Sequence, residues 1–502
     1  MSDHFDLLVV GGGINGVGIA RDAAGRGLSV LLVEKDDLAS HTSSASTKLV
    51  HGGLRYLEMY EFRLVAESLR EREVLLRAAP HIIWPLRFVM PHEPSMRPKW
   101  MLRAGLFLYD RIGGAMSLPG SKAIDLTIPP HRGVLQDRLR KGFEYSDCWV
   151  EDSRLVVLCA MDAEARGAKI LCRTRCEQLE RQADSWTATL HDAAGERRVS
   201  AKAVVNAAGP FVDNVAKQAL GAGTPSHLRL VKGSHIIVSR RFPGDHAYIF
   251  QQPDKRIVFA IPYERDFTLI GTTDLLYDGD LDRVRISEEE IDYLCAAASR
   301  YFLSRVTREE IASSYAGVRP LYEDNAASNS TVTRDYVFEL EADGGAPILS
   351  VYGGKITTFR KLAEHALANL GKAMEMPGEA WTRHAVLPGG EFADGDFARF
   401  LWEASEQYEF APPEMLLRLA RAYGTRLAEI LEGAKGLADL GECLGGDLYE
   451  AELRYLVKRE YACTGEDVLW RRSKLGLHLP ADAQRRVADW MDAHAPHSPD
   501  FA

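Results

Sequence analysis

The first 35 residues alternate between short apolar runs and a helical pattern. Residues 5–10 and 29–33 are apolar runs, and residues 15–26 between them carry apolar positions at helical spacing. Short continuous apolar runs are typical of buried strands, whereas apolar residues three and four positions apart are typical of a helix. The pattern therefore predicts a β-α-β unit at the start of the chain.

Strand patterns dominate the middle of the chain. Residues 60–78 predict a surface-facing helix, because Arg and Glu stand between its apolar positions. Strand and helix patterns alternate over residues 148–205 and give way to β-rich segments over residues 228–275. These segments predict a separate antiparallel sheet.

The remaining chain becomes increasingly helical in pattern. Ser287 and Glu290 have the spacing of a capping box, which predicts that a helix begins after Ser287. An apolar strand pattern follows at residues 347–352 and a helical pattern at residues 360–370. Beyond a Pro-Gly-Gly linker few strand patterns remain, so we predict a domain boundary near residue 388.

The composition is that of a soluble enzyme with several domains. At 502 residues the chain exceeds the size of one hydrophobic core, and 46% of its residues are hydrophobic and 26% charged. Its formal charge of -10 argues against a nucleic-acid partner, because neutralising phosphates requires concentrated positive charge. Seven cysteines without a CxxC pair indicate neither a metal site nor an iron–sulfur site.

Two features bear on where the protein works. The N-terminus lacks a basic region and a cleavage site for export, which predicts a protein inside the cell. The sequence contains no run of roughly 18 apolar residues, the length that a membrane-spanning helix needs. Any membrane contact is therefore expected to be peripheral. Residues 97–111 combine Arg97, Lys99 and Arg103 with aromatic and aliphatic residues, a pattern typical of an interfacial helix and equally of a helix packed within a domain.

A second basic cluster near the C-terminus could add to membrane contact or serve a dimer interface. It consists of Trp470, Arg471, Arg472 and Lys474.

The first chemical motif is a glycine cluster between the first strand and the first helix. Gly11, Gly13 and Gly16 form a GxGxxG pattern, and Glu34 ends the second strand at the distance expected for binding a ribose hydroxyl. Such glycines allow a tight turn and close approach of a pyrophosphate to the helix N-terminus. The motif predicts a dinucleotide site and disfavours NADP, but it does not choose between FAD and NAD.

Two later segments favour FAD over NAD, because they resemble segments of a known flavoprotein family. Residues 204–209 form a strand that ends in small residues, and residues 353–359 place glycines and hydroxyls at a helix start. Together with the first cluster, they resemble the glutathione-reductase-like (DAO-like) flavoproteins. That resemblance implies FAD extended across the sheet, with its isoalloxazine ring at the third segment.

The most specific motif is TSSASTKLVHGGLRYLE at residues 42–58, which is poor core material and suits a loop that lines a flavin and a polar ligand. A plain solvated loop is the alternative. With further motifs, this segment closely resembles the FAD-dependent glycerol-3-phosphate dehydrogenases, and the likeness covers essentially the whole chain. The further motifs are YSDCWV (145–150), KGSHIIV (232–238), GTTD (271–274), GVRPL (317–321), TRDY (333–336) and the tail segment 449–477.

The resemblance and the chemistry together imply a fold and three domains. The fold class is α/β, with a Rossmann-like FAD-binding domain, an antiparallel-sheet substrate domain and a C-terminal all-α domain. The FAD-dependent region spans residues 1–388 and the helical domain spans residues 389–502. Within the first region, the FAD-binding parts are about 1–80, 150–220 and 345–375, and the substrate-domain parts are about 81–149 and 221–344.

The implied cofactor residues come from five segments of the chain. They are Gly11, Gly13, Ile14, Asn15, Gly16, Glu34, Thr42, Ser43, Ser44, Ser46, Thr47, Lys48, Leu49, Ala208, Gly209, Gly354, Lys355, Ile356 and Thr357.

A phosphomonoester substrate requires cationic donors. Arg55 and Arg319 match family positions that bind substrate, and Tyr56, Thr272 and Lys355 are expected close by in the same site. An ordinary salt bridge is the alternative for each arginine.

Oxidation of a secondary alcohol also requires a base near the reacting carbon. His51 is the first candidate and His235 the second, while Lys355 or an arginine such as Arg319 could instead polarise the alkoxide.

The resemblance implies oxidation of sn-glycerol 3-phosphate to dihydroxyacetone phosphate, with electrons passed from FAD to membrane ubiquinone or a similar quinone. It also implies a homodimer in the cytoplasm, peripherally attached to the inner face of the cytoplasmic membrane. An oxygen-using glycerol-3-phosphate oxidase shares the motifs. The fold would also suit an amine or amino-acid oxidase, or a flavoprotein that binds RNA or a protein partner without turnover.

Overall fold

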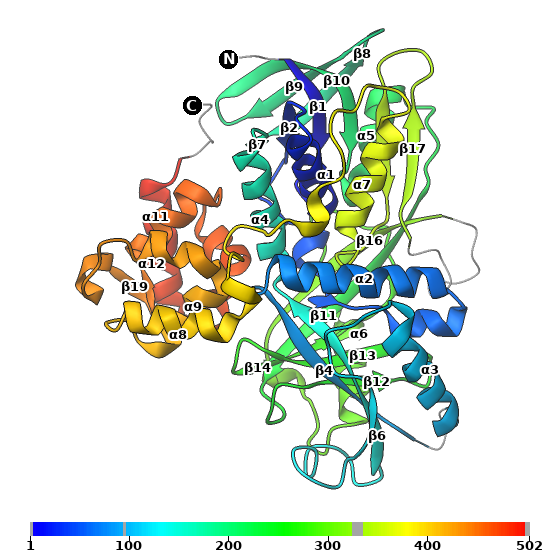
Figure 1. Cartoon of the computed structure of the whole chain (residues 1–502), viewed down its shortest axis with the longest axis vertical. Coiled ribbons are helices and arrows are strands. Elements are labelled where there is room, and N and C mark those ends of the chain that lie inside the picture. Colours follow the sequence, from blue (N-terminus) through cyan, green and yellow to red (C-terminus); the bar gives the residue numbers. More distant parts are fainter. Residues whose placement is uncertain (1–3, 94–96, 324–334, 497–502) are drawn as a thin grey trace.

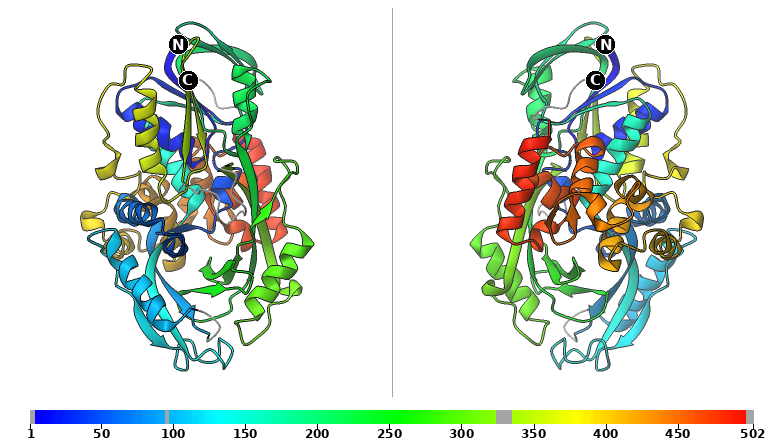
Figure 2. Two further views of the ribbon diagram at one scale, coloured as in Figure 1. Left: turned by 90° about the vertical axis from the view of Figure 1, so that its right-hand side faces the viewer. Right: turned by 90° about the vertical axis from the view of Figure 1, so that its left-hand side faces the viewer.

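The computed structural model describes residues 4–93, 97–323 and 335–496. Two large sheets lie end to end, and a helical C-terminal body packs beside their junction (Figure 1). The two turned views show that the C-terminal body and helices α2 and α3 lie on different sides of the molecule (Figure 2).

The first sheet contains the predicted β-α-β unit. Its central strand β1 is parallel to both β2 and β10, and β10 is in turn parallel to β18. Leu7 and Val9 of β1 pack on the α1 side of the sheet, whereas Leu8 and Val10 pack on the other side. Burial on both faces explains the unbroken apolar run in this strand.

The bounds of this part are β1 (His4–Val10), α1 (Ile14–Gly25), β2 (Val30–Val33), α4 (Asp152–Ala165), β7 (Lys169–Leu171), β8 (Arg175–Arg181), β9 (Trp186–Asp192), β10 (Gly195–Asn206), η3 (Gly209–Phe211), α5 (Val212–Leu220), β17 (Val337–Glu341), β18 (Ile348–Tyr352) and α7 (Phe359–Leu370). Helices α1, α4 and α7 share one hydrophobic core, in which α1 contacts both of the others.

The second sheet has ten strands and is antiparallel except where β12 runs parallel to β4. It draws its strands from two separate stretches of the chain and is covered by α6 on one side and by α2 and α3 on the other. Its bounds, with the neighbouring turns, are η1 (Thr42–Ser44), β3 (Leu49–Val50), η2 (Leu54–Met59), α2 (Phe62–Ala78), β4 (Ile83–Pro91), α3 (Lys99–Ile112), β5 (Lys122–Asp125), β6 (Lys141–Val150), β11 (Leu228–Ser239), β12 (Ala247–Gln251), β13 (Ile257–Tyr263), β14 (Phe267–Gly271), β15 (Leu275–Leu276), α6 (Glu288–Ser299), η4 (Arg308–Glu310) and β16 (Ile311–Tyr322).

The prediction that residues 60–78 form a surface-facing helix was wrong about exposure. Helix α2 is present, but 11 of its 17 residues are buried. Its buried charged side chains are neutralised by partners inside the protein: Arg72 pairs with Asp147 at 2.9 Å, and Glu71 pairs with Arg360 at 2.7 Å. Internal ion pairing gives a buried helix the polar pattern of an exposed one.

The C-terminal body has a hydrophobic core of its own and contains one small hairpin. Its bounds are η5 (Thr382–His384), η6 (Ala393–Gly395), α8 (Phe397–Gln407), α9 (Pro413–Tyr423), η7 (Gly424–Arg426), α10 (Leu427–Ile430), η8 (Leu437–Leu440), β19 (Cys443–Gly445), β20 (Leu448–Tyr449), α11 (Glu450–Arg459), η9 (Asp467–Arg472), η10 (Leu475–Leu477) and α12 (Ala481–His494).

Candidate functional site

The glycine cluster forms the turn between β1 and α1, and its geometry leaves no room for side chains. Gly11 has a φ of +113°, and a Cβ atom placed there would lie 2.5 Å from the Ala207 carbonyl oxygen. A Cβ atom on Gly16 would lie 1.9 Å from the Gly11 carbonyl oxygen. The backbone amide of Ile14, the first residue of α1, donates to Ser43 Oγ at 3.0 Å. The N-terminus of α1 therefore faces the serine-rich segment.

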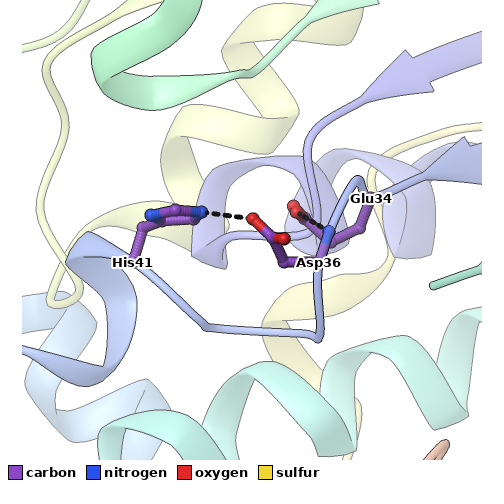
Figure 3. Close-up of side chains that lie close together, drawn as sticks. All are labelled: Glu34, Asp36 and His41. Atoms are coloured by element: carbon purple, nitrogen blue, oxygen red, sulfur yellow. Dashed lines mark hydrogen bonds and ion pairs between the residues drawn. The ribbon is translucent and has the colours of Figure 1, made fainter. Parts of the chain in front are cut away.

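Glu34 lies at the end of β2, where its carboxylate accepts backbone hydrogen bonds from Gly12 at 2.7 Å and Asp36 at 2.9 Å. Burial raises the pKa of this carboxyl above its usual value. Figure 3 shows Glu34 beside Asp36, whose side chain is joined to His41 at 2.8 Å. These three side chains come close enough to hold a metal ion, but each is already engaged by a partner within the protein. The role of Glu34 in nucleotide binding stays a prediction.

A cavity of about 240 Å³ opens beside this carboxylate, between the glycine turn and the start of α5. Its lining includes several of the residues that the sequence assigns to the cofactor: Gly11, Gly13, Glu34, Thr42, Ser43, Ala208 and Gly209.

The segment of residues 42–48 bridges the two sheets. Thr42 Oγ1 donates to the Val318 carbonyl oxygen at 2.7 Å, which joins the segment to β16. Lys48 Nζ and Ser46 Oγ each donate to the Asp152 carboxylate at 2.7 Å. Lys48 is only 1% exposed. These contacts anchor the partly buried segment to β16 and α4 and disfavour a plain solvated loop. Its contacts with the flavin stay a prediction.

The third cofactor segment, residues 353–359, contacts both the glycine turn and the segment that contains His51. Asn15 Nδ2 on α1 donates to the Gly353 carbonyl oxygen at 3.0 Å, and Gly354 has a φ of +96°. Thr357 Oγ1 accepts a hydrogen bond from the His51 backbone amide at 3.3 Å. Three segments far apart in the sequence thus converge at the C-terminal ends of β1 and β18, where a parallel sheet holds its ligand.

Three further residues assigned to the cofactor lie beside these segments. Leu49 is buried in β3, Ile356 packs against the core of the first sheet, and Thr47 Oγ1 lies 3.0 Å from His235 Nε2.

Arg319 on β16 is the best-defined cation of the predicted substrate site. Its guanidinium donates to Asp274 at 3.1 Å and to Thr272 Oγ1 at 3.4 Å. A Cβ atom on Gly233, in the adjacent strand β11, would lie 2.6 Å from Arg319 Nη2. The motifs KGSHIIV, GTTD and GVRPL therefore meet at one guanidinium. The roles of Asp274 and Gly233 were missed, although both residues lie within motifs that the sequence singled out.

A second cation of the predicted substrate site, Lys355, lies in the third cofactor segment. Lys355 Nζ lies 4.2 Å from the centre of the Tyr56 ring, a distance typical of a cation–π contact. Tyr56 and the partly buried Arg55 belong to η2, which begins after Gly53 in the left-handed region. The structure therefore joins Lys355 to Tyr56 and Arg319 to Thr272. These two contacts group four of the five predicted substrate residues into two pairs.

The two candidate bases differ in their surroundings. His235 is 1% exposed and stacks on Tyr315 with 4.8 Å between ring centres. Burial, together with the nearby Arg319 and Lys48 cations, holds the pKa of His235 well below its usual value. His51 is partly buried and meets Phe259 edge to face, with 6.5 Å between ring centres. His235 is thus a neutral imidazole with weak basicity, whereas His51 lies directly beside the third cofactor segment.

Two residues of the second basic cluster lie inside the protein and can contact neither a membrane nor a dimer partner, whereas Trp470 and Arg471 are partly buried and their suggested contacts stay predictions. Arg472 is fully buried, and Lys474 is 9% exposed. The TRDY motif begins with residues 333 and 334, which lie outside the described residues.

The comparisons with known proteins agree with this geometry. A family model described as FAD dependent oxidoreductase matches residues 6–360, and one described as C-terminal domain of alpha-glycerophosphate oxidase matches residues 380–500. The chain belongs to the FAD-dependent oxidoreductase family. Its resemblance to that family's glycerol-3-phosphate dehydrogenases, and its predicted fold class, are confirmed.

Relatives match this FAD-dependent oxidoreductase over nearly its full length. A glycerol-3-phosphate dehydrogenase from Pseudomonas aeruginosa is 52% identical, covering 99% of this chain and 97% of the relative. A D-erythritol 1-phosphate dehydrogenase from Brucella abortus is 51% identical, covering 97% of each chain. The solved structure of a glycerol-3-phosphate dehydrogenase from Bacillus halodurans, complexed with FAD, has a TM-score of 0.76 and 29% identity, and the match covers 99% of this chain and 95% of the other.

The residues present fit FAD, which is the cofactor of this oxidoreductase. The close approach at Gly11 and Gly16 leaves backbone surface for a pyrophosphate, and the buried Glu34 carboxylate suits a ribose diol.

Proposed function

We propose that this FAD-dependent oxidoreductase oxidises sn-glycerol 3-phosphate to dihydroxyacetone phosphate. The observation that supports this proposal is the position of Arg319, held by Asp274 and Thr272 and close enough to depress the pKa of the buried His235. A cation held in this way can bind a phosphate dianion, and an imidazole nearby suits an alcohol that must lose a proton.

In the proposed reaction, Arg319 binds the phosphate group, with Lys355, Arg55, Tyr56 and Thr272 completing the substrate site. FAD supplies the hydride acceptor, flavin N5, for the hydrogen on C2 of the substrate. An imidazole nitrogen of His51 takes the proton from the C2 hydroxyl.

His235 lies behind the flavin-binding segment, bonded to Thr47 and stacked on Tyr315. In our proposal it stays neutral and orients this wall of the site.

D-Erythritol 1-phosphate is a second candidate substrate, because a relative with this activity in its name is as similar as the glycerol-3-phosphate dehydrogenases. It carries the same phosphate group on a longer polyol chain. The phosphate-binding role of Arg319 applies to either substrate, and only a comparison of turnover separates them.

We further propose that a membrane quinone reoxidises the enzyme and that α3 contacts the membrane surface from the cytoplasmic side. Trp100 is 70% exposed and Phe107 51% exposed on one face of α3. Arg97, Lys99 and Arg103 lie on or beside the same helix and are exposed. Exposed aromatic residues flanked by cations suit an anionic bilayer interface.

Among the helices of the described residues, none has the length and apolar composition needed to cross a bilayer. A homodimer and the division of the chain into domains near residue 388 remain proposals.

An anaerobic absorbance titration tests the reaction. Glycerol 3-phosphate should bleach the flavin band of the purified holoenzyme, and a soluble quinone should restore it faster than oxygen does. Faster recovery with oxygen would identify an oxidase instead. Erythritol 1-phosphate and a panel of amino acids serve as parallel substrates. If glycerol 3-phosphate leaves the band unchanged, the proposed reaction is refuted, whereas bleaching by another substrate would reassign it.

A further inference from the structure

The segment from the end of β2 through η1, residues 34–44, is held by contacts with residues near the C-terminus. Asp37 is 2% exposed, and its carboxylate accepts hydrogen bonds from two arginines of η9 in the C-terminal body. Arg471 Nε donates to Asp37 at 2.6 Å, and Arg472 Nη2 donates at 2.7 Å. Arg472 is fully buried, so its charge has no access to solvent.

A third ion pair connects the same turn to the first sheet. Asp467 of η9 binds Arg173 at 2.7 Å, and the Arg173 backbone amide donates to the Asp36 carbonyl oxygen at 2.7 Å. Arg471 also pairs with Asp467. The C-terminal body therefore contacts the segment in two ways. It binds the segment's carboxylate, Asp37, directly, and it binds Arg173, in the chain that follows β7, which in turn contacts Asp36.

The segment held in this way supplies much of one wall of the nucleotide cavity. Glu34 and the residues from Ala39 to Ser43 line that cavity. The Ala39 backbone amide donates to the Gly12 carbonyl oxygen at 3.3 Å, and Ser43 accepts from Ile14. Asp37 lies between these two groups of lining residues, so its position determines how they approach the glycine turn.

A buried carboxylate without its cations is unfavourable, because its desolvation is no longer compensated. If the arginines release Asp37, the segment must rearrange to expose that carboxylate to water. Such a rearrangement would displace Glu34 and Ser43 from the positions in which they meet a nucleotide.

We propose that the C-terminal helical body is part of the FAD site: Arg471 and Arg472 act through Asp37 as positioning residues that hold residues 34–44 in the conformation that retains FAD. This role concerns the cofactor and is independent of which polyol phosphate is oxidised.

The test compares FAD release from two purified holoenzyme variants with release from the parent protein. Asp37→Asn keeps the shape of the side chain but removes the charge that the arginines bind. Glu460→Gln is the matched control, because Glu460 is equally buried and pairs with Arg154 of α4 at 2.8 Å across the same interface. Release is followed by the rise in flavin fluorescence after dilution, and circular dichroism checks that each variant remains folded.

We expect Asp37→Asn to release FAD about 10-fold faster or more, which corresponds to roughly 1.4 kcal/mol. Glu460→Gln should release FAD within about twofold of the parent rate, a change of less than roughly 0.5 kcal/mol. Equal acceleration in both variants would overturn the proposal, because general loosening of the interface would then explain it. Unchanged release in Asp37→Asn would overturn it as well.

A milder variant covers the case in which Asp37→Asn does not fold. Arg471→Gln leaves the fully buried Arg472 pair in place, and Arg471 is 12% exposed at its side chain. It should release FAD about threefold faster or more, or roughly 0.7 kcal/mol. A parent-like rate would overturn the proposal.

Discussion

Individual charged residues at the site are defined by the partner that each one binds inside the protein. Arg319 is oriented by Asp274, and Lys48 by Asp152. Neither carboxylate is a neighbour of its cation in the sequence, so a motif shows the cation and leaves its partner unidentified. The sequence therefore singles out the cations that are assigned to the site, but it did not predict which carboxylates orient them.

Arg319→Lys should raise the KM for glycerol 3-phosphate with little change in kcat. Lysine keeps the charge but loses the planar donor fork that binds Asp274, Thr272 and a phosphate together. The rise should be about 10- to 150-fold, because a hydrogen bond to a charged group contributes about 1.5–3 kcal/mol.

Steady-state kinetics measures the effect of Arg319→Lys. Arg241→Lys is the control, because Arg241 pairs with Glu310 at the other end of the β11–β16 pair. A parent-like KM for Arg319→Lys would contradict the assigned role.

His51→Gln should lower kcat more than His235→Gln. A general base contributes about 10²- to 10⁴-fold and works best when its pKa is near the operating pH. The depressed pKa of His235 makes it the weaker base. Single-turnover flavin reduction as a function of pH measures this, and the acid limb of the profile should disappear only in His51→Gln. Loss of that limb in His235→Gln alone would exchange the two roles.

At the scale of helices and strands, the sequence predicted local elements well. The apolar runs gave β1 and β2, and the capping box at Ser287 is present at the start of α6. These elements depend on neighbours within a few residues. The burial of α2 was mispredicted, because it depends on Asp147 and Arg360, which are distant in the sequence.

The candidate site was predictable to a similar degree. Glycines at tight turns carry their own local requirement, and so the three cofactor segments could be recognised before their contacts were known. The link between Asp37 and Arg472 spans 435 residues, and no local pattern indicates it.

Trp100→Glu should weaken binding to anionic lipid vesicles by about 10-fold or more, because it replaces roughly 1.5–3 kcal/mol of apolar burial with a repelled charge. Trp402→Glu on α8 is the matched control, since Trp402 is 62% exposed on the C-terminal body. Vesicle cosedimentation measures both variants. Equal binding by Trp100→Glu and the parent protein would exclude α3 as the contact.

At the scale of the whole molecule, one buried histidine links the main body to the C-terminal body. His81 is fully buried, lies edge to face with Phe392, and accepts a hydrogen bond from Arg421 through its carbonyl oxygen. Burial, with the nearby Arg154 and Arg421 cations, lowers the pKa of His81 to about 3. The folded protein therefore keeps this ring neutral at pH values at which an unfolded chain would protonate it.

His81→Phe should make the protein less sensitive to acid. Below pH 6.5 His81 binds a proton in the unfolded state, whereas in the folded state it stays neutral down to about pH 3. The free energy of unfolding therefore decreases as the pH falls from 6.5 to about 3. At pH 4.5 the parent protein should have lost about 2–3 kcal/mol more than the variant, relative to neutral pH.

Denaturant unfolding at several pH values measures the effect of His81→Phe. His191→Phe, at an exposed position on β9, should leave the pH dependence unchanged. Parallel pH profiles for the parent protein and His81→Phe would refute this account of acid sensitivity.

The order of strands in the first sheet also has a consequence for biosynthesis. Strand β1 pairs with β10, and β10 pairs with β18, so the sheet combines residues near 4–10, 195–206 and 348–352. A ribosome that has released the first 50 residues has made the glycine turn and β2, but neither β10 nor β18. The nascent chain must reach α7 before the third cofactor segment can fold against Asn15, so FAD capture is a late event that follows translation of most of the polypeptide.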